Sequence, residues 1–190
     1  MIADAPSRIA DALATGLRRS HFFQSPPSES VDDLECDTLV GRFPEFAATG
    51  SLRVEYDDHT CRWQLERATH RKTGGHFQKA VISNGQRLLG WYLYYLDRTT
   101  VADVLQIVAN PSSIHEVLDH LFYQAWQQGA TAVTGRLEPR FLQAFSDKYC
   151  LLHRRGPWML VNARRPELLR SFQSGEALFS RFDGEWTLGF

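Results

Sequence analysis

Several features that define common classes of protein are missing from this sequence. Its three cysteines, Cys36, Cys61 and Cys150, are odd in number and show no Cys-x-x-Cys or His spacing, which argues against a disulfide framework and a structural zinc site. No stretch approaches the roughly 20 apolar residues of a membrane-spanning helix. Asp4 and Asp11 lie in the N-terminal segment, which has no apolar run of the kind a secretory signal needs. We therefore expect a reduced, cytoplasmic protein without a metal.

The motifs of several enzyme classes are also absent. There is no Gly-x-Ser-x-Gly elbow for a hydrolase, and neither a P-loop nor a dinucleotide-binding glycine pattern is present. The formal net charge is −1, so the whole molecule is not a binder of polyanions. Residues 29–66 hold ten acids against three arginines, whereas residues 136–165 hold seven Lys/Arg against two acids. The basic segment is compatible with an RNA- or phosphate-binding module, but we favour solvated surface that pairs with the acidic half.

The size of the chain allows one domain with an appendage. It has 190 residues, of which 43% are hydrophobic and 23% are charged, an ordinary globular composition. Ile9, Leu13 and Leu17 follow a four-residue spacing that indicates a thin helical stripe, and Pro26-Pro27 marks a linker over Ser20 to Ser30. We expect an N-terminal helical extension and linker over residues 1–50, and a single domain over residues 51–190.

The centre of that domain is a strand–helix–strand pattern. Val104 to Ala109 is a short apolar run typical of a buried strand. Ser113-x-x-Glu116 is a capping box that predicts the start of a helix ending near Gln128. The apolar stripe of this helix consists of Ile114, Val117, Leu118, Leu121, Phe122, Ala125 and Trp126. A second strand over residues 131–137 completes a right-handed parallel crossover, which predicts that Leu105–Ala109 pairs with Ala132–Leu137.

Other elements are predicted before and after this unit. Asp57-Asp58 offers an N-cap for a helix over residues 59–69, and Asn84-Gly85 predicts a type I′ hairpin between strands over 77–83 and 87–97. Alternating aromatic residues on the second of these strands put one face in the core and leave the other as a candidate pocket lining. The later elements are a helix after Pro139 with Tyr149 on its apolar face, a strand over 158–161, a helix over 166–174 and an edge strand over 186–190.

This order of elements resembles the GNAT superfamily of N-acyltransferases. The resemblance covers about residues 55–190, which are similar to the C-terminal portion of longer bacterial GNAT-like proteins. It is carried by Leu88-Leu89-Gly90-Trp91-Tyr92-Leu93-Tyr94-Tyr95-Leu96, Val104-Leu105-Gln106-Ile107-Val108-Ala109, Val117-Leu118-Asp119-His120-Leu121, Gly135-Arg136-Leu137-Glu138-Pro139 and Arg181-Phe182-Asp183-Gly184-Glu185-Trp186. It implies an α+β fold, a GNAT-like mixed sheet with helices on both faces.

The resemblance also implies a cofactor site for acetyl-CoA or another acyl-CoA. In this family the acyl-CoA lies where the fourth strand separates from the fifth, and its pyrophosphate sits on a glycine-rich loop at the next helix start. Carried onto this chain, the binding residues are Gln106, Ile107, Val108, Ser112, Ser113, Ile114 and His115. The corresponding loop, Asn110-Pro111-Ser112-Ser113, departs from the pattern because it holds no glycine and no arginine.

The catalytic residues that the resemblance implies are Asp103, Glu138 and Tyr149. Asp103 would act as the base for an amine or peptide acceptor, Glu138 would hold a water, and Tyr149 would act as the acid. A second interpretation is a catalytically silent GNAT-like domain that binds a partner or ligand, or completes a tandem pair. A homodimer, or a tightly docked C-terminus, is expected from the apolar C-terminal strand. We expect no membrane contact, and we do not favour nucleic acid as a partner.

Overall fold

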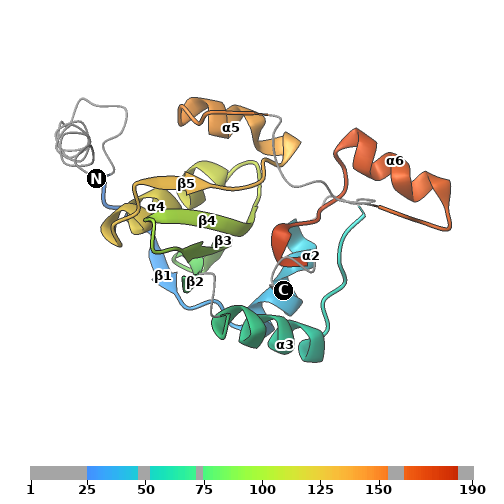
Figure 1. Ribbon diagram of the computed structural model, residues 1–190, viewed down its shortest axis with the longest axis horizontal. Coiled ribbons are helices and arrows are strands. Elements are labelled where there is room, and N and C mark those ends of the chain that lie inside the picture. The colour runs from blue at the N-terminus through green and yellow to red at the C-terminus, as the bar shows by residue number, and fades with distance from the viewer. Residues whose placement is uncertain (1–24, 47–51, 72–74, 154–160, 184–190) are drawn as a thin grey trace.

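The computed structural model describes residues 25–46, 52–71, 75–153 and 161–183 (Figure 1). Within these ranges a single mixed sheet has the strand order β1-β2-β3-β4-β5. Its strands are β1 (Ser30–Asp32), β2 (His76–Asn84), β3 (Arg87–Leu96), β4 (Val101–Ala109) and β5 (Ala132–Thr134). The helices are α2 (Cys36–Phe46), α3 (Asp58–Thr69), α4 (Ile114–Gln127), α5 (Leu142–Asp147) and α6 (Pro166–Ser174), with 3-10 turns η1 (Pro139–Phe141) and η2 (Arg181–Asp183).

The predicted hairpin between β2 and β3 is confirmed, but the predicted turn type is wrong. Asn84 pairs with Arg87, so the two-residue loop consists of Gly85 and Gln86. Gly85 has a φ of +59°, whereas Gln86 is not among the non-glycine residues with positive φ. A type I′ turn needs positive φ at both central residues, and a glycine at the first position alone is the pattern of type II′.

β4 continues the meander and carries a bulge at its centre. It is antiparallel to β3, with Leu93 opposite Gln106 and Tyr94 opposite Val104, so that Leu105 is the extra residue. A β-bulge bends the strand and increases its local twist. The two halves of β4 therefore point in different directions.

The parallel crossover of β4, α4 and β5 is confirmed, but the predicted pairing is not. β5 pairs with Val101–Asp103, at the start of β4, and not with Leu105–Ala109. The sheet partnership with β5 ends just before the bulge at Leu105, where β4 changes direction. Beyond Thr134 the two segments separate, as the resemblance to the GNAT superfamily implies for its fourth and fifth strands.

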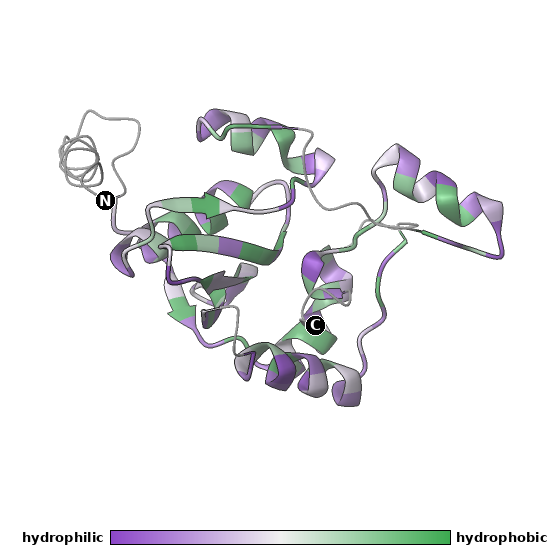
Figure 2. Ribbon diagram, viewed as in Figure 1, coloured by the Kyte–Doolittle hydropathy of each residue, from purple (hydrophilic) through white to green (hydrophobic). Residues whose placement is uncertain are grey.

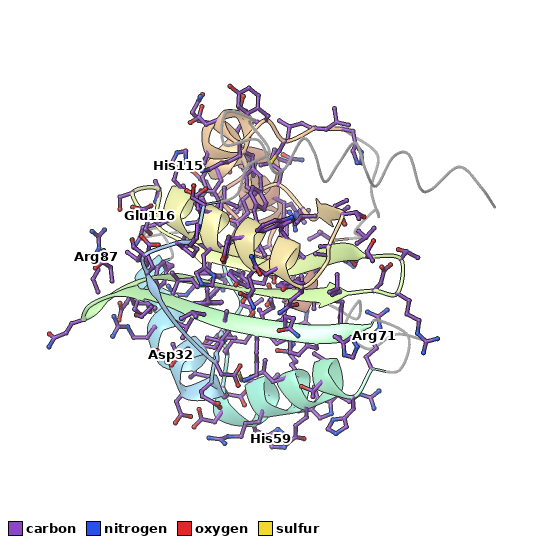
Figure 3. The ribbon with its side chains drawn as sticks, turned by 90° about the vertical axis from the view of Figure 1, so that its left-hand side faces the viewer. Asp32, His59, Arg71, Arg87, His115 and Glu116 are labelled. Atoms are coloured by element: carbon purple, nitrogen blue, oxygen red, sulfur yellow. The ribbon has the colours of Figure 1, made fainter. Side chains whose placement is uncertain are left out.

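Hydrophobic cores fill both faces of the sheet. Trp91, Leu93 and Tyr95 of β3 pack against α2 and α3, and Tyr92 and Tyr94 pack on the side of α4. Figure 3 shows α3 and α4 on opposite sides of the sheet, and Figure 2 shows hydrophobic stretches in the strands and mostly hydrophilic residues in α3. All five side chains are at most 2% exposed, so both faces of β3 are core.

The segment before residue 50 takes part in this architecture. β1 pairs with β2, and α2 contributes Leu39, Phe43 and Phe46 to the core on the α3 side. α3 begins as predicted, because the Asp57 carboxylate accepts the Thr60 backbone N–H at 2.8 Å. The predicted N-terminal stripe and the strand at residues 186–190 lie outside the described residues, as does most of the strand at 158–161.

Candidate functional site

The candidate site is the gap that opens between β4 and the chain after β5. Gly135 permits the close approach at its closed end, because a Cβ built there would lie 3.0 Å from the Val104 Cβ. The lining comes from the second half of β4, from the segment after β5 and from a third segment near the C-terminus. These lining residues are Val104, Leu105, Gln106, Ile107, Arg136, Glu138, Phe141, Phe145, Phe179 and Ser180.

The third segment forms part of the wall of this gap. Phe179 and Ser180 line the space together with β4, and the remaining cavity is about 20 Å³, room for about one water molecule. The Leu178 N–H donates to the Leu52 carbonyl at 2.7 Å, and Arg136 Nη1 donates to the Phe179 carbonyl at 2.8 Å. We call residues 178–183 the plug.

A buried hydrogen-bond network fixes the plug to β4. Trp91 Nε1 donates to Gln106 Oε1 at 3.0 Å. Gln106 Nε2 donates to the Tyr56 hydroxyl and to Ser180 Oγ, both at 3.0 Å. The Asp183 carboxylate accepts from the Tyr56 hydroxyl and from Ser180 Oγ, the latter at 2.7 Å. Each of these polar groups has a partner, which is the condition under which buried polar groups stabilise a fold.

Asp183 stands out in this network by its electrostatics. Burial raises its pKa to about 7, even though the backbone N–H of Ser180 favours the ionised form. Asp183 also lines a second small cavity, with Gln106, Glu138 and Arg140 among its neighbours. A carboxyl group that titrates near neutral pH beside a cavity is suited to accept or hold a proton.

The structure gives the predicted catalytic residues different surroundings. Asp103 forms an ion pair with Arg181 of the plug and accepts a hydrogen bond from Thr134 Oγ1 at 3.2 Å. Glu138 lines the gap, and its carboxylate is 2.7 Å from Arg140 Nε. Tyr149 follows α5 with a φ of +56° and is 64% exposed, so its predicted place on the apolar face of the helix is wrong. Glu138 thus lines the gap, whereas Asp103 lies beside the plug and Tyr149 lies on the surface.

The predicted cofactor-binding residues also lie in different places. Gln106 and Ile107 line the gap, and Val108 packs in the core on the α2 side. Ser112 is exposed and accepts from Arg87 at 3.3 Å, and His115 lies 3.7 Å from the Asp147 carboxylate. Figure 3 places His115 and Glu116 at the start of α4, with Arg87 at the same end of the molecule.

The predicted capping box at Ser113 is not formed. Ser113 is buried, and its hydroxyl donates to the Leu89 carbonyl of β3 at 2.7 Å instead of accepting a helix N–H. Ile114, the first residue of α4, is buried as well. The helix start is thus anchored into the sheet by side chains that were predicted to face a ligand.

An acyl-CoA does not fit this site. The gap in which its pantetheine arm would lie leaves only about 20 Å³ between its lining residues, which include Phe179 and Ser180. The Ser113 hydroxyl is committed to Leu89. Pro111 has no N–H to offer a pyrophosphate, and the loop has no glycine to let a phosphate approach the backbone.

Several cations of the basic segment make contacts within the molecule. Arg136 bonds the plug, Arg140 pairs with Glu138, and Lys148 pairs with Asp119 of α4. These contacts leave less charge for a phosphate or RNA ligand. Among the described residues we find no cluster of three or more His, Cys, Asp or Glu side chains that could hold a metal ion. In the same part of the chain no helix has the length and apolarity to cross a membrane.

Comparisons with known proteins align this chain with several solved structures at low identity. No family model matches the sequence, and no curated protein matches it. A variant of the Thermus thermophilus protein TTHA1254 aligns with a TM-score of 0.48 and 13% identity, covering 72% of this chain and 99% of that one. Glucosamine-6-phosphate N-acetyltransferase from Arabidopsis thaliana aligns with a TM-score of 0.47 and 10% identity, covering 71% and 98%. An acetyltransferase from Trypanosoma brucei aligns with a TM-score of 0.47 and 14% identity, covering 70% and 100%.

The chain has a GNAT-like α+β fold. Its own topology carries this assignment: a helix, an antiparallel meander, a parallel crossover through α4, and strands that separate after their first three paired residues. Sequence reasoning missed the residues that close the gap, namely Tyr56, Ser180, Asp183 and Arg181. Tyr56 and the residues of the plug lie far from β4 in the sequence, and the resemblance named Asp183 and Arg181 only within its closing stretch, with no role in a site.

Proposed function

We propose that this chain is a GNAT-like domain that binds a partner protein and does not transfer acyl groups. The observation that carries the proposal is the plug, which lines the narrow gap beside β4 and is held there by the Gln106 network. A space for about one water molecule cannot take up an acyl thioester without the release of this segment.

A second feature supports a protein as the partner. Large apolar side chains are exposed on α5 and just after it, at Leu142, Leu151 and Leu152. Contiguous exposed apolar side chains are typical of surfaces that bind other proteins. We propose a second GNAT-like domain or a second copy of this chain as the partner that covers these side chains.

Thermal unfolding in the presence of acetyl-CoA tests this proposal. A ligand that binds the folded state raises the melting temperature by mass action. We expect no change in melting temperature at millimolar acetyl-CoA, and light scattering should show a dimer or a complex with a GNAT-like partner. A rise in melting temperature that depends on the acetyl-CoA concentration would contradict the proposal.

N-acyl transfer to an amine is the second candidate function. Asp183 favours it, because a carboxyl group with a pKa of about 7 beside the gap is suited to hold the proton of an amine. The release of free thiol from acetyl-CoA in the presence of amines or short peptides distinguishes the two candidates. Turnover that is lost in Asp183→Asn would support the second candidate; no turnover is expected from the first.

A further inference from the structure

A groove on the α4 face of the sheet, opposite the face that α2 and α3 cover, is larger than the gap. It has a volume of about 270 Å³, nearly twice the ~150 Å³ of a cavity that one removed leucine side chain leaves. It runs over β2 and β3 between β1 and α4. We call it the β1–α4 groove, lined among others by Val31, Gln78, Ala80, Tyr92, Tyr94 and Gln124.

The groove exists because one helix covers only part of this face. On the other face α2 and α3 pack over the sheet. On the groove side α4 packs on β3 and β4, and no second helix lies over β1 and β2 among the described residues. Val31 of β1 is therefore 48% exposed although its sheet partner Ile82 is fully buried. Figure 3 shows α4 above the sheet and Asp32 of β1 at the edge facing the viewer.

We propose that residues 1–24 of this chain dock in the β1–α4 groove, with Ile9, Leu13 and Leu17 facing its floor. The segment joins residues 25–29, which lead directly into β1, so the docking stripe is tethered to one wall of its own groove. Tethering gives such a segment an effective concentration of about millimolar, which favours it over a free competitor. The stripe is too short to hold a helix in water by itself, and burial in the groove supplies the missing stabilisation.

Charge complementarity supports the same occupant. Glu29, Asp32 and Asp33 stand at the β1 side of the groove, and Lys79 neutralises Asp33 at a distance of 2.5 Å. Arg18 and Arg19 follow the stripe on the side that leads toward β1. Docking therefore brings two cations of the segment toward Glu29 and Asp32, and opposite charges attract one another within about a Debye length.

The groove floor is also suited to an apolar guest with a polar rim. Tyr94 donates its hydroxyl hydrogen to Gln128 Oε1 at 2.9 Å, and Gln128 Nε2 donates to Gln78 Oε1 at 3.2 Å. Tyr92 is hydrogen bonded to His120 Nδ1 at 2.9 Å. These polar groups are paired beneath the groove, so an aliphatic stripe can cover them without leaving a tyrosine or glutamine unsatisfied.

Hydrogen exchange of the full chain tests the docking. Leu13→Asp puts a charge in the docking stripe, and Thr15→Asp is the matched control on the opposite side of the same helical pattern. We expect amide exchange in β1 and in the edge of β2 to become at least tenfold faster in Leu13→Asp and to change less than twofold in Thr15→Asp. Equal exchange in Leu13→Asp and the native chain would overturn the proposal.

Two further measurements identify the occupant. Val31→Asp puts a charge in the groove itself. The increase in exchange rate in the double variant should not be the product of the two single increases, because both changes break one contact. Multiplying effects would overturn the proposal. Exchange at tenfold lower protein concentration should be unchanged, whereas protection that falls on dilution would assign the groove to a second copy and overturn docking within one chain. The inference does not depend on whether the domain binds acyl-CoA.

Discussion

The side-chain amide of Gln106, in the middle of β4, donates a hydrogen bond to Ser180 Oγ of the plug at 3.0 Å. The two residues are 74 positions apart in the sequence and meet in the gap that β5 leaves open. The same amide group bonds Tyr56 and its oxygen accepts from Trp91. One glutamine thus joins the sheet, the segment before α3 and the plug.

Gln106→Leu should destabilise the fold through this junction. The substitution leaves the buried Trp91 N–H without its acceptor and removes the N–H that Gln106 donates to the Tyr56 and Ser180 hydroxyls, which keep Asp183 as a partner. The expected cost is about 1–3 kcal/mol in the free energy of unfolding. Urea denaturation measures it. Gln127→Leu on the exposed side of α4 is the control and should change the free energy by less than about 0.5 kcal/mol. Similar values for the two variants would contradict the account of the network.

The pH dependence of stability should report the Asp183 carboxyl group. Burial raises its pKa from 3.8 to about 7, so between these values the folded protein keeps a proton that the unfolded chain has released. Stability from this group is therefore lost as the pH rises toward 7. From pH 5 to pH 8 the Asp183→Asn variant should gain stability relative to the native chain, on the order of 3 kcal/mol.

The control for this measurement is Asp57→Asn. Hydrogen bonds from Thr60 lower the pKa of Asp57, so it stays ionised over pH 5–8, and asparagine is an equally good N-cap. Burial also lowers the pKa of His120, which makes stability fall as the pH drops below about 6.5, and this contribution is common to all three proteins. If the unfolding free energies of Asp183→Asn and Asp57→Asn changed with pH in parallel, Asp183 would not titrate near pH 7.

Tyr92→Phe should reveal a buried hydrogen bond between the sheet and α4. Burial raises the pKa of Tyr92, so its hydroxyl stays protonated, and this hydroxyl is hydrogen bonded to His120 Nδ1 at 2.9 Å. The variant leaves that nitrogen unpaired and should cost about 1–3 kcal/mol in unfolding free energy. Tyr123→Phe, on a more accessible part of α4, is the control. An equal and small effect in both variants would show that the hydrogen bond between Tyr92 and His120 does not stabilise the fold.

Two glycines should respond to alanine in opposite directions. A Cβ at Gly90 would lie 2.1 Å from the Val108 carbonyl oxygen of β4, a distance that forces the strands apart, whereas a Cβ at Gly41 in α2 meets nothing within 4 Å. Gly41→Ala should raise the unfolding free energy by about 0.5–1 kcal/mol, and Gly90→Ala should lower it by more than about 2 kcal/mol. A tolerated alanine at residue 90 would show that β3 and β4 are less closely paired there.

The parts of the fold that were predictable from the sequence are those set by local patterns. The spacing of Val117, Leu118 and Leu121 gives α4 one buried stripe, and Asn84-Gly85 marks a hairpin whatever its turn type. The pairing of β5 was not predictable in the same way, because the bulge at Leu105 changes the register without a sequence signal of its own.

The candidate site was less accessible to sequence reasoning than the fold. Ser113-x-x-Glu116 has the pattern of a capping box, but the Leu89 carbonyl of β3 competes for the serine hydroxyl and wins. Tyr149 has the spacing of an apolar face, yet α5 ends at Asp147 and Tyr149 adopts positive φ beyond it. The partners of Gln106 come from segments 50 and 74 residues away, and local patterns carry no information about such contacts.

The central claim is that the plug excludes acyl-CoA from the gap between β4 and β5. Isothermal titration of the full chain with acetyl-CoA tests it most directly. We expect no heat of binding at millimolar acetyl-CoA, because Phe179 and Ser180 of the plug line a space of only about 20 Å³ beside β4. Saturable heat with one acetyl-CoA bound per native chain would contradict the claim.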